Sequence, residues 1–179
     1  FASCNKHVVK PGSREVISSG TDGDLRRIMF INDSTGYIAG GIRYFRSDLL
    51  TTRDGGRTWS PRHFATDDDH ILYGLCHFQE RVYAAAFNGK IFRLAHTEAE
   101  WQYNQAPWWG PFQSIGFATA NKGFIVSGQG FESGRIIQID SSGQVSRMDT
   151  FDFSLNDVCF ADSESGYICG YGIILKTAD

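Results

Sequence analysis

One hairpin-like segment recurs along this chain of 179 residues. Its pattern is a Phe, a polar stretch, a Gly six positions after the Phe, and then an aromatic residue followed by Ile. The closest copies are Phe30–Gly40, Phe117–Gly128 and Phe160–Gly170, and a looser copy is Leu75–Ala85. The equivalent points Gly36, Val82, Gly123 and Gly166 are separated by 46, 41 and 43 residues. This period is typical of β-propeller blades, each made of four short antiparallel strands.

The composition favours an all-β chain and excludes several other classes. Gly contributes 20 residues and aromatic residues 14%, whereas the helix formers Leu and Lys number only 8 and 5. Short strands and tight turns are therefore favoured over a helical bundle. No apolar stretch approaches the roughly 20 residues that a membrane-spanning helix needs. The net charge is −3 and the Arg residues are interspersed with acidic ones, so nucleic acid is not expected as a partner.

The length predicts one domain, because domains average roughly 150 residues. We expect a β-propeller over residues 14–179, preceded by a leader or linker over residues 1–13. The repeats are assigned to residues 24–68, 69–111, 112–153 and 154–179, the last of them incomplete. A single blade cannot bury both of its faces, so neighbouring blades must stack around an axis.

The first repeat carries a second motif, Thr52-Arg53-Asp54-Gly55-Gly56-Arg57-Thr58-Trp59. It matches the Asp-box, S/T-x-D-x-G-x-T-W, of the bacterial neuraminidase (BNR) repeats. Together with the hairpin pattern, the unit resembles the repeats of photosystem II stability and assembly factor-like propellers. The resemblance spans residues 24–179 and is strongest in the first and fourth units. The second unit keeps only Trp101 of the box, and the third keeps the turn Asp140–Gly143.

We expect the Asp-box residues to have a structural role. The Asp54 carboxylate can accept backbone N–H bonds of its own turn, between Thr52 and Thr58. Gly55 and Gly56 can adopt positive φ, and Trp59 can bury its ring between layers.

Asp-boxes also occur in sialidases, so a glycoside hydrolase is an alternative. The Phe/Tyr-Arg-Ile-Pro segment that carries the first sialidase arginine is absent, and the nearest string is Phe45–Asp48. The G-x-S-x-G elbow of serine hydrolases is also missing. We therefore expect no catalytic residues, no metal and no cofactor.

The segment from Trp101 to Phe112 is the most unusual stretch of the sequence, with two adjacent Trp residues between prolines. Trp101, Tyr103, Trp108 and Trp109 are the candidate surface for a sugar ring or for side chains of a protein partner. The alternative is that these rings cover the edge of a blade. The acidic stretch Thr66–His70 has no EF-hand spacing and is interpreted as a solvated loop.

The N-terminal sequence Phe1-Ala2-Ser3-Cys4-Asn5 is similar to the end of a bacterial lipoprotein signal. Acylation of Cys4 would anchor an extracytoplasmic domain, periplasmic or on the cell surface, and this anchor is the only membrane contact expected. The alternative is a chance match. Cys159 and Cys169 fall on neighbouring strands of one predicted hairpin. A disulfide is conceivable there, although buried thiols are favoured because Cys packs as a small hydrophobe.

Two ways of completing the ring are open. Ile173–Asp179 aligns with Asp48–Asp54, so the last repeat ends within its own Asp-box, as in part of a longer propeller. Alternatively, Arg14–Ser19 has the character of an outer strand and would complete the last blade of a four-bladed ring.

The resemblance implies a non-enzymatic scaffold that binds a protein partner, because photosynthetic members of the family help to assemble a membrane complex. One alternative is a carbohydrate-binding or sialidase-like propeller. Another is a structural module of a larger surface protein. Since one fold supports many functions, these alternatives stay open on the sequence.

Overall fold

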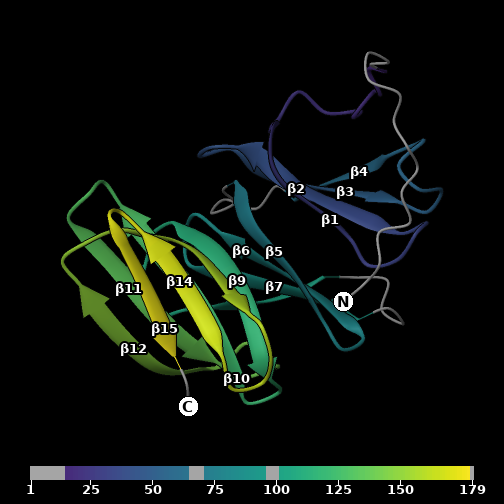
Figure 1. Ribbon diagram of the computed structural model, residues 1–179. Coiled ribbons are helices and arrows are strands. Elements are labelled where there is room, and N and C mark those ends of the chain that lie inside the picture. The colour runs from purple at the N-terminus through teal and green to yellow at the C-terminus, as the bar shows by residue number, and fades with distance from the viewer. Residues whose placement is uncertain (1–14, 65–70, 96–100, 178–179) are drawn as a thin grey trace.

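The computed structural model describes residues 15–64, 71–95 and 101–177, which contain fifteen β-strands and no helix (Figure 1). The strands of the first two repeats are β1 (Asp24–Phe30), β2 (Gly36–Ile42), β3 (Arg46–Thr52), β4 (Ser60–Phe64), β5 (Leu72–Phe78), β6 (Arg81–Ala86), β7 (Lys90–Ala95) and β8 (Gln102–Gln105). Those of the last two are β9 (Phe112–Thr119), β10 (Lys122–Gln129), β11 (Ser133–Ile139), β12 (Val145–Phe151), β13 (Leu155–Phe160), β14 (Gly166–Gly170) and β15 (Ile173–Thr177).

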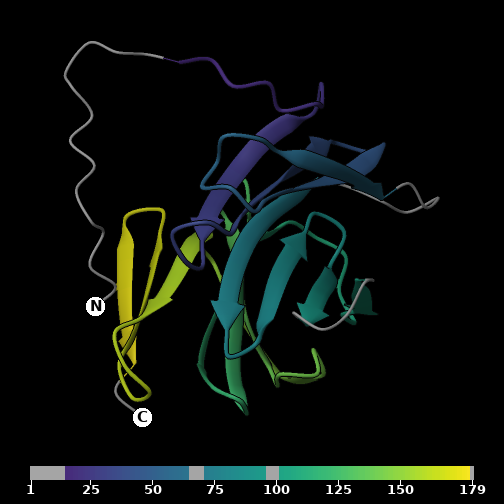
Figure 2. The ribbon, with the colours of Figure 1, turned by 90° about the vertical axis from the view of Figure 1, so that its right-hand side faces the viewer.

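The strands form four antiparallel sheets in chain order. Three sheets have four strands each, β1–β4, β5–β8 and β9–β12, and the fourth has three, β13–β15, within the described residues. The inner strands β1, β5, β9 and β13 pack against the preceding or following sheet, so the sheets stack one after another (Figures 1 and 2). The predicted all-β propeller of antiparallel blades is therefore confirmed.

Each sheet has a following face, toward the next sheet, and a leading face, toward the preceding one. The following faces repeat one chemistry, an aromatic residue, a small residue or Val, and a longer aliphatic residue. These residues are Tyr37, Ala39 and Leu49 in the first sheet, Tyr83, Ala85 and Ile91 in the second, and Phe124, Val126 and Ile136 in the third. The leading face of the next sheet packs on each of these sets. Its residues include Leu72 and Leu75 in the second sheet, Phe112 and Ile115 in the third, and Leu155 and Val158 in the fourth. The core is thus a series of inter-sheet layers.

The stack is open at both ends. On the leading face of the first sheet, Leu25, Ile28 and Phe30 are exposed, Ile28 by 59%. Ile28 pairs with Ile38 in the register of the first sheet, and the equivalent pair in the third sheet is Ile115 with Ile125. Ile115, unlike Ile28, is only 2% exposed. Among the described residues, no sheet packs against this end face.

The fourth sheet is uncovered on its following face. Tyr167, Cys169 and Ile174 occupy the positions of Tyr37, Ala39 and Leu49 by strand register, and all three are exposed. The expectation of buried thiols was wrong for Cys159 and Cys169. Both are free and exposed, because no further sheet formed by residues 15–64, 71–95 or 101–177 packs on this face.

One of the two alternatives for completing the ring placed an outer strand of the last blade over Arg14–Ser19. Residues 15–19 belong to no strand, and the fourth sheet ends at β15. The segment that follows is held on the first sheet instead. The Thr21 hydroxyl donates a 2.5 Å hydrogen bond to Asp48, and Gly20 lies against the ring of Pro61.

Candidate interaction surface

The loop between the second and third strands of every sheet carries an aromatic side chain. Tyr44 and Phe45 lie between β2 and β3, Phe87 between β6 and β7, Phe131 between β10 and β11, and Tyr171 between β14 and β15. Because these loops are equivalent in the repeat, they lie at the same end of the stack. Together with Trp109, these residues are called the aromatic face. All but the half-buried Phe87 are exposed, Phe45 by 74%.

Rings and guanidinium groups join the loops of the first two sheets. Tyr44 meets Phe87 edge to face, with ring centroids 5.5 Å apart. The Arg43 guanidinium lies 5.3 Å from the Phe87 centroid and donates a 3.1 Å hydrogen bond to the Tyr73 hydroxyl. Arg26 lies 5.4 Å from the Tyr73 centroid. These contacts align aromatic planes with cations, as cation–π attraction favours.

The backbone of Tyr44 is in an unusual conformation, with φ of +71°. A bulky non-Gly residue seldom adopts this left-handed region, at a cost of roughly 1 kcal/mol or more, and such outliers gather at binding sites. Phe45 N–H donates to the Ile42 carbonyl and closes the turn. The strained turn presents both aromatic side chains to solvent.

The second half of the aromatic face involves the third and fourth sheets. Phe131 and Tyr171 lie with ring centroids 4.7 Å apart, across the two sheets. Trp108 links the third sheet to the second. Its backbone lies against Gly89 of the second sheet, and the guanidinium of Arg135, on β11 of the third sheet, lies 4.2 Å from its ring centroid. Trp109 beside it is exposed. The aromatic face therefore continues over all four sheets.

The four aromatic residues singled out in the sequence lie at different places. Trp101 is half-buried against Phe64, between the first two sheets. Tyr103 is exposed on β8, with its ring centroid 5.6 Å from that of Phe92. Trp108 is half-buried and Trp109 is exposed in the loop between β8 and β9. The structure brings only Trp109 to the aromatic face, with the half-buried Trp108 beside it.

Sequence reasoning missed the loop aromatics of this face. A signal was present, because in three repeats an aromatic residue follows closely after the glycine at the end of the second strand. The segments are Gly41-Ile42-Arg43-Tyr44, Gly130-Phe131 and Gly170-Tyr171.

A polar cleft of about 220 Å³ adjoins the aromatic face at the starts of the inner strands, between Arg26, Tyr73 and Asp157. Asp157 forms a 2.6 Å ion pair with Arg27 and accepts a 2.5 Å hydrogen bond from the Ser114 hydroxyl. Both members of the ion pair are nearly half exposed, so the pair adds little stability. It supplies charge of both signs next to the aromatic rings.

The segment Thr52–Trp59 forms a hydrogen-bonded turn after β3. The Asp54 carboxylate accepts bonds from the Thr58 hydroxyl at 2.6 Å, the Thr58 N–H at 3.0 Å and the Thr52 hydroxyl at 2.8 Å. These bonds, led by those from Thr58, hold the pKa of Asp54 well below its ordinary value. Gly55 and Gly56 have φ of +74° and +87°. The carboxylate is thus occupied by its own turn.

The ring of Trp59 is half-buried and meets Phe30 edge to face at 5.9 Å. The turn lies at the end of the first sheet opposite the aromatic face, because Gly55 donates a backbone hydrogen bond to the loop between β1 and β2. Assignment of this turn to the BNR family remains a prediction from its sequence.

A buried carboxylate organises the first sheet on its leading face. Asp48 is fully buried and accepts hydrogen bonds from Thr21, from Arg46 at 2.9 Å and from His63 Nδ1 at 2.8 Å. Burial alone would raise the pKa of Asp48, but the bonds from Arg46, Thr21 and His63 outweigh it and lower the pKa. This network ties the segment before β1 to β3 and β4.

Within the described ranges, no group of three or more His, Cys, Asp and Glu side chains is placed to hold a metal ion. Nor is any helix there long and apolar enough to cross a bilayer. Cys4 and the whole acidic stretch Thr66–His70 lie outside the described residues.

Comparison with known proteins shows the fold. No protein family model matches the chain, and no curated protein matches it. YCF48 from Cyanidioschyzon merolae is similar in structure, with a TM-score of 0.63 and 12% identity over 86% of this chain. The match covers 50% of the YCF48 chain, so this chain spans about half its length. The computationally designed Ika4 protein has a TM-score of 0.59 and 14% identity, over 93% of this chain and 98% of its own.

Proposed function

We propose that this propeller is a non-enzymatic scaffold that binds a protein partner through its aromatic face, in an assembly or interaction role. The observation that carries the proposal is the repetition of aromatic side chains on the equivalent loops of all four sheets. The sequence resemblance to photosystem II stability and assembly factor-like repeats supports the same role.

The chemistry of the face fits a protein better than a sugar. Tyr, Trp and Arg are the residues that dominate the binding energy at protein interfaces. Here they are adjacent, with Arg43 against Tyr44 and Phe87. A sugar ring needs one flat aromatic platform, whereas Tyr44 and Phe87 meet edge to face and extend over two sheets. A broad surface with mixed charge beside it suits another folded chain.

We also propose that the protein is extracytoplasmic and lipid-anchored through Cys4. The support is the segment Phe1–Asn5. Metabolic labelling with an alkyne fatty acid would test this proposal. The expected result is a label that Cys4→Ser removes, while Cys76→Ser keeps it. A label that persists in Cys4→Ser would contradict the anchor.

The binding proposal is tested by replacing Tyr44 and Phe131 with a photo-crosslinking phenylalanine, one at a time, in cells of the native host. The matched control carries the same group at Tyr103, which is exposed on β8. We expect both aromatic-face positions to yield the same crosslinked protein and Tyr103 to yield none of it. Equal crosslinking at all three positions, or none, would contradict the proposal.

A glycan array separates the carbohydrate alternative. The proposal expects no saturable sugar binding by the intact chain. Saturable binding that is lost in Trp109→Ala, and kept in Tyr103→Ala, would favour a sugar ligand instead.

A further inference from the structure

Two buried polar atoms lie next to each other in the third sheet without a hydrogen-bond partner. They are the hydroxyl of Ser127, on β10, and Nε of Arg135, on β11. Among the described residues, no other buried side-chain nitrogen or oxygen lacks a partner. The two residues pair directly in the strand register, so their side chains project from the same face of the sheet. Since buried polar groups are nearly always hydrogen-bonded, two unpaired ones at one place indicate a site for a ligand.

Arg135 is half-buried and its guanidinium has no acceptor within the chain. No described residue forms an ion pair or a hydrogen bond with it. It lies instead against the ring of Trp108, 4.2 Å from the ring centroid. Stacking on an aromatic ring fixes the plane of a guanidinium and leaves its N–H groups unused. The donors of Arg135 are therefore oriented before any ligand arrives.

The first sheet shows how the fold satisfies a buried charge at this position. By strand register, Asp48 of the first sheet is equivalent to Arg135 of the third. Asp48 is fully buried and accepts hydrogen bonds from Thr21, Arg46 and His63. In the first sheet the chain thus supplies the complementary groups itself. In the third sheet the described residues supply none, so the position suits a group from another molecule.

The ring of Trp108 covers both unpaired atoms next to the aromatic face. It is stacked on Phe112, with ring centroids 6.0 Å apart, and on Arg135. Ser127 stands between Phe112 and Arg135 in the row of paired residues, so a ring that contacts both neighbours lies over its hydroxyl. Trp108 is half-buried and belongs to the loop between β8 and β9. A ligand therefore reaches both atoms by displacing one side chain.

The two donors suit a carboxylate. Nε and a neighbouring Nη of an arginine donate two parallel hydrogen bonds that match the two oxygens of a carboxylate. The Ser127 hydroxyl adds a third donor to one of those oxygens. A cation would be repelled by the guanidinium, and a single carbonyl oxygen would leave one N–H without an acceptor.

We propose that Ser127 and Arg135 bind a carboxylate, which replaces the Trp108 ring over the guanidinium. The carboxylate comes from an acidic side chain of the protein partner, and in this respect the inference rests on the proposed function. Trp109, which follows Trp108, is exposed on the aromatic face, so a partner bound there reaches the site. A free carboxylic acid is the other source of the same group.

Acetate is the probe, because it carries a carboxylate and little else. The intact chain is titrated with sodium acetate while sodium chloride keeps the ionic strength constant, and tryptophan fluorescence is recorded. We expect a saturable change with a midpoint at roughly 1–30 mM, as Trp108 leaves the guanidinium. Trp108→Phe should lose this change, although acetate should still raise its melting temperature. An internal water that satisfies both atoms predicts no saturable response, and that result would overturn the proposal.

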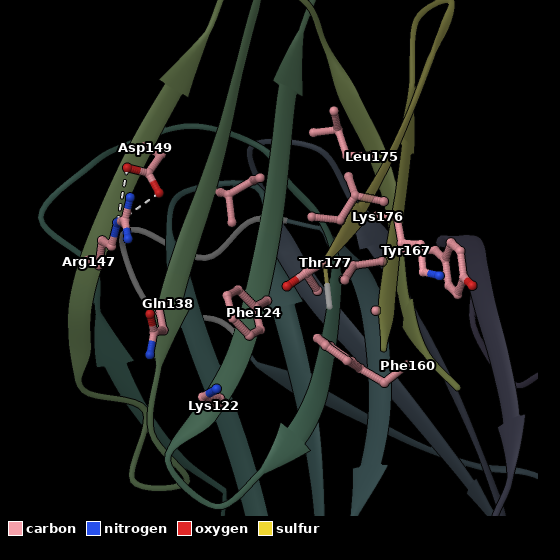
Figure 3. A pocket seen from close by; sticks show the side chains of 14 residues that line it. Lys122, Phe124, Gln138, Arg147, Asp149, Phe160, Tyr167, Leu175, Lys176 and Thr177 are labelled. Carbon is pink, nitrogen blue, oxygen red and sulfur yellow. Dashed lines mark hydrogen bonds and ion pairs between the residues drawn. The ribbon is translucent and has the colours of Figure 1, made fainter. Parts of the chain in front are cut away.

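Substitutions of arginine locate the site. Arg135→Met should abolish the acetate response, and Arg135→Lys, which keeps the charge but has no Nε donor, should weaken binding about 10-fold or more. Arg147→Met is the control, because it removes the same charge from the neighbouring strand β12. Arg147 forms a 3.0 Å ion pair with Asp149 there (Figure 3). A response that survives in Arg135→Met, or that disappears equally in Arg147→Met, would contradict the site.

Two buried serines separate binding from folding. Ser127→Ala removes a hydroxyl without a partner, so it should not lower the urea midpoint, yet it should weaken acetate binding about 10-fold. The hydroxyl of the buried Ser114 donates a 2.5 Å hydrogen bond to Asp157. Ser114→Ala should therefore lower the urea midpoint and leave acetate binding unchanged. If Ser127→Ala instead loses stability and keeps its affinity for acetate, the assignment of this hydroxyl is wrong.

The source of the carboxylate is tested in cells, with the photo-crosslinking group at Phe131. Arg135→Met should lower the yield of crosslinked partner about 10-fold, and Arg147→Met should not. An unchanged yield in Arg135→Met would contradict a side chain of the partner and assign the site to a free carboxylic acid. The acetate titration uses the chain alone, so its outcome does not depend on whether the aromatic face binds a protein.

Discussion

Ile115 and Ile28 occupy the same register position in different sheets, and only Ile115 is covered by a preceding sheet. Ile115 is 2% exposed and packs in the layer between the second and third sheets, whereas Ile28 is 59% exposed. Ile→Ala removes three carbons, each worth about 0.8 kcal/mol when buried, and a cavity adds to that loss. We expect Ile115→Ala to lower the free energy of unfolding by about 3 kcal/mol. Ile28→Ala should lower it by about 1 kcal/mol, because less than half of its surface is buried.

Urea unfolding followed by tryptophan fluorescence gives the midpoint and slope for each variant. Equal losses at the two positions would refute the reasoning that coverage by the next sheet decides the stability of this fold.

Three further results are expected. Gly89→Ala should lower the melting temperature more than Gly130→Ala. Both positions have positive φ, but an added Cβ at Gly89 overlaps the Trp108 carbonyl, whereas one at Gly130 meets nothing. Equal shifts in melting temperature would refute this reasoning. Folding lowers the pKa of Asp48. Its contribution to the free energy of unfolding is therefore present above the unfolded pKa of about 4 and is lost as the pH falls through the folded value. In urea unfolding, Asp48→Asn should reduce the loss of stability at acid pH, and an unchanged loss would contradict this prediction. Burial raises the pKa of the Cys76 thiol to about 11, so maleimide should label it far more slowly than the two exposed thiols of the fourth sheet, as peptide mass mapping would show.

Some features were predictable because they depend on short-range chemistry. The repeated glycine and aromatic spacing placed β2, β10 and β14, and their hairpins follow from the turn residues between alternating strands. The turn around Asp54 is likewise local, since its partners lie within four residues. Such interactions are specified by neighbours in the chain and need no knowledge of the rest of the fold.

Other features depended on which sheet covers which. The sequence marks Cys159 and Cys169 as small apolar residues of a hairpin, as it does Ala39, yet the first two are exposed and the third is buried. Composition gives no sign of this difference, because burial is decided by the presence of a neighbouring sheet. The alternative of an outer strand over Arg14–Ser19 depended on tertiary contacts in the same way. Residues 15–19 belong to no strand, and the hydrogen bond between Thr21 and Asp48 holds the following segment on the first sheet.

The aromatic face shows the same division. The sequence by itself determined the repeating blade, its strands and its turns, because periodicity and turn chemistry act over a few residues. Only the tertiary structure gathered Tyr44, Phe87, Phe131 and Tyr171 at one end of the stack and left two sheet faces open. These outcomes arise from packing between segments about 40 residues apart, where side-chain contacts and not local preference set the free energy.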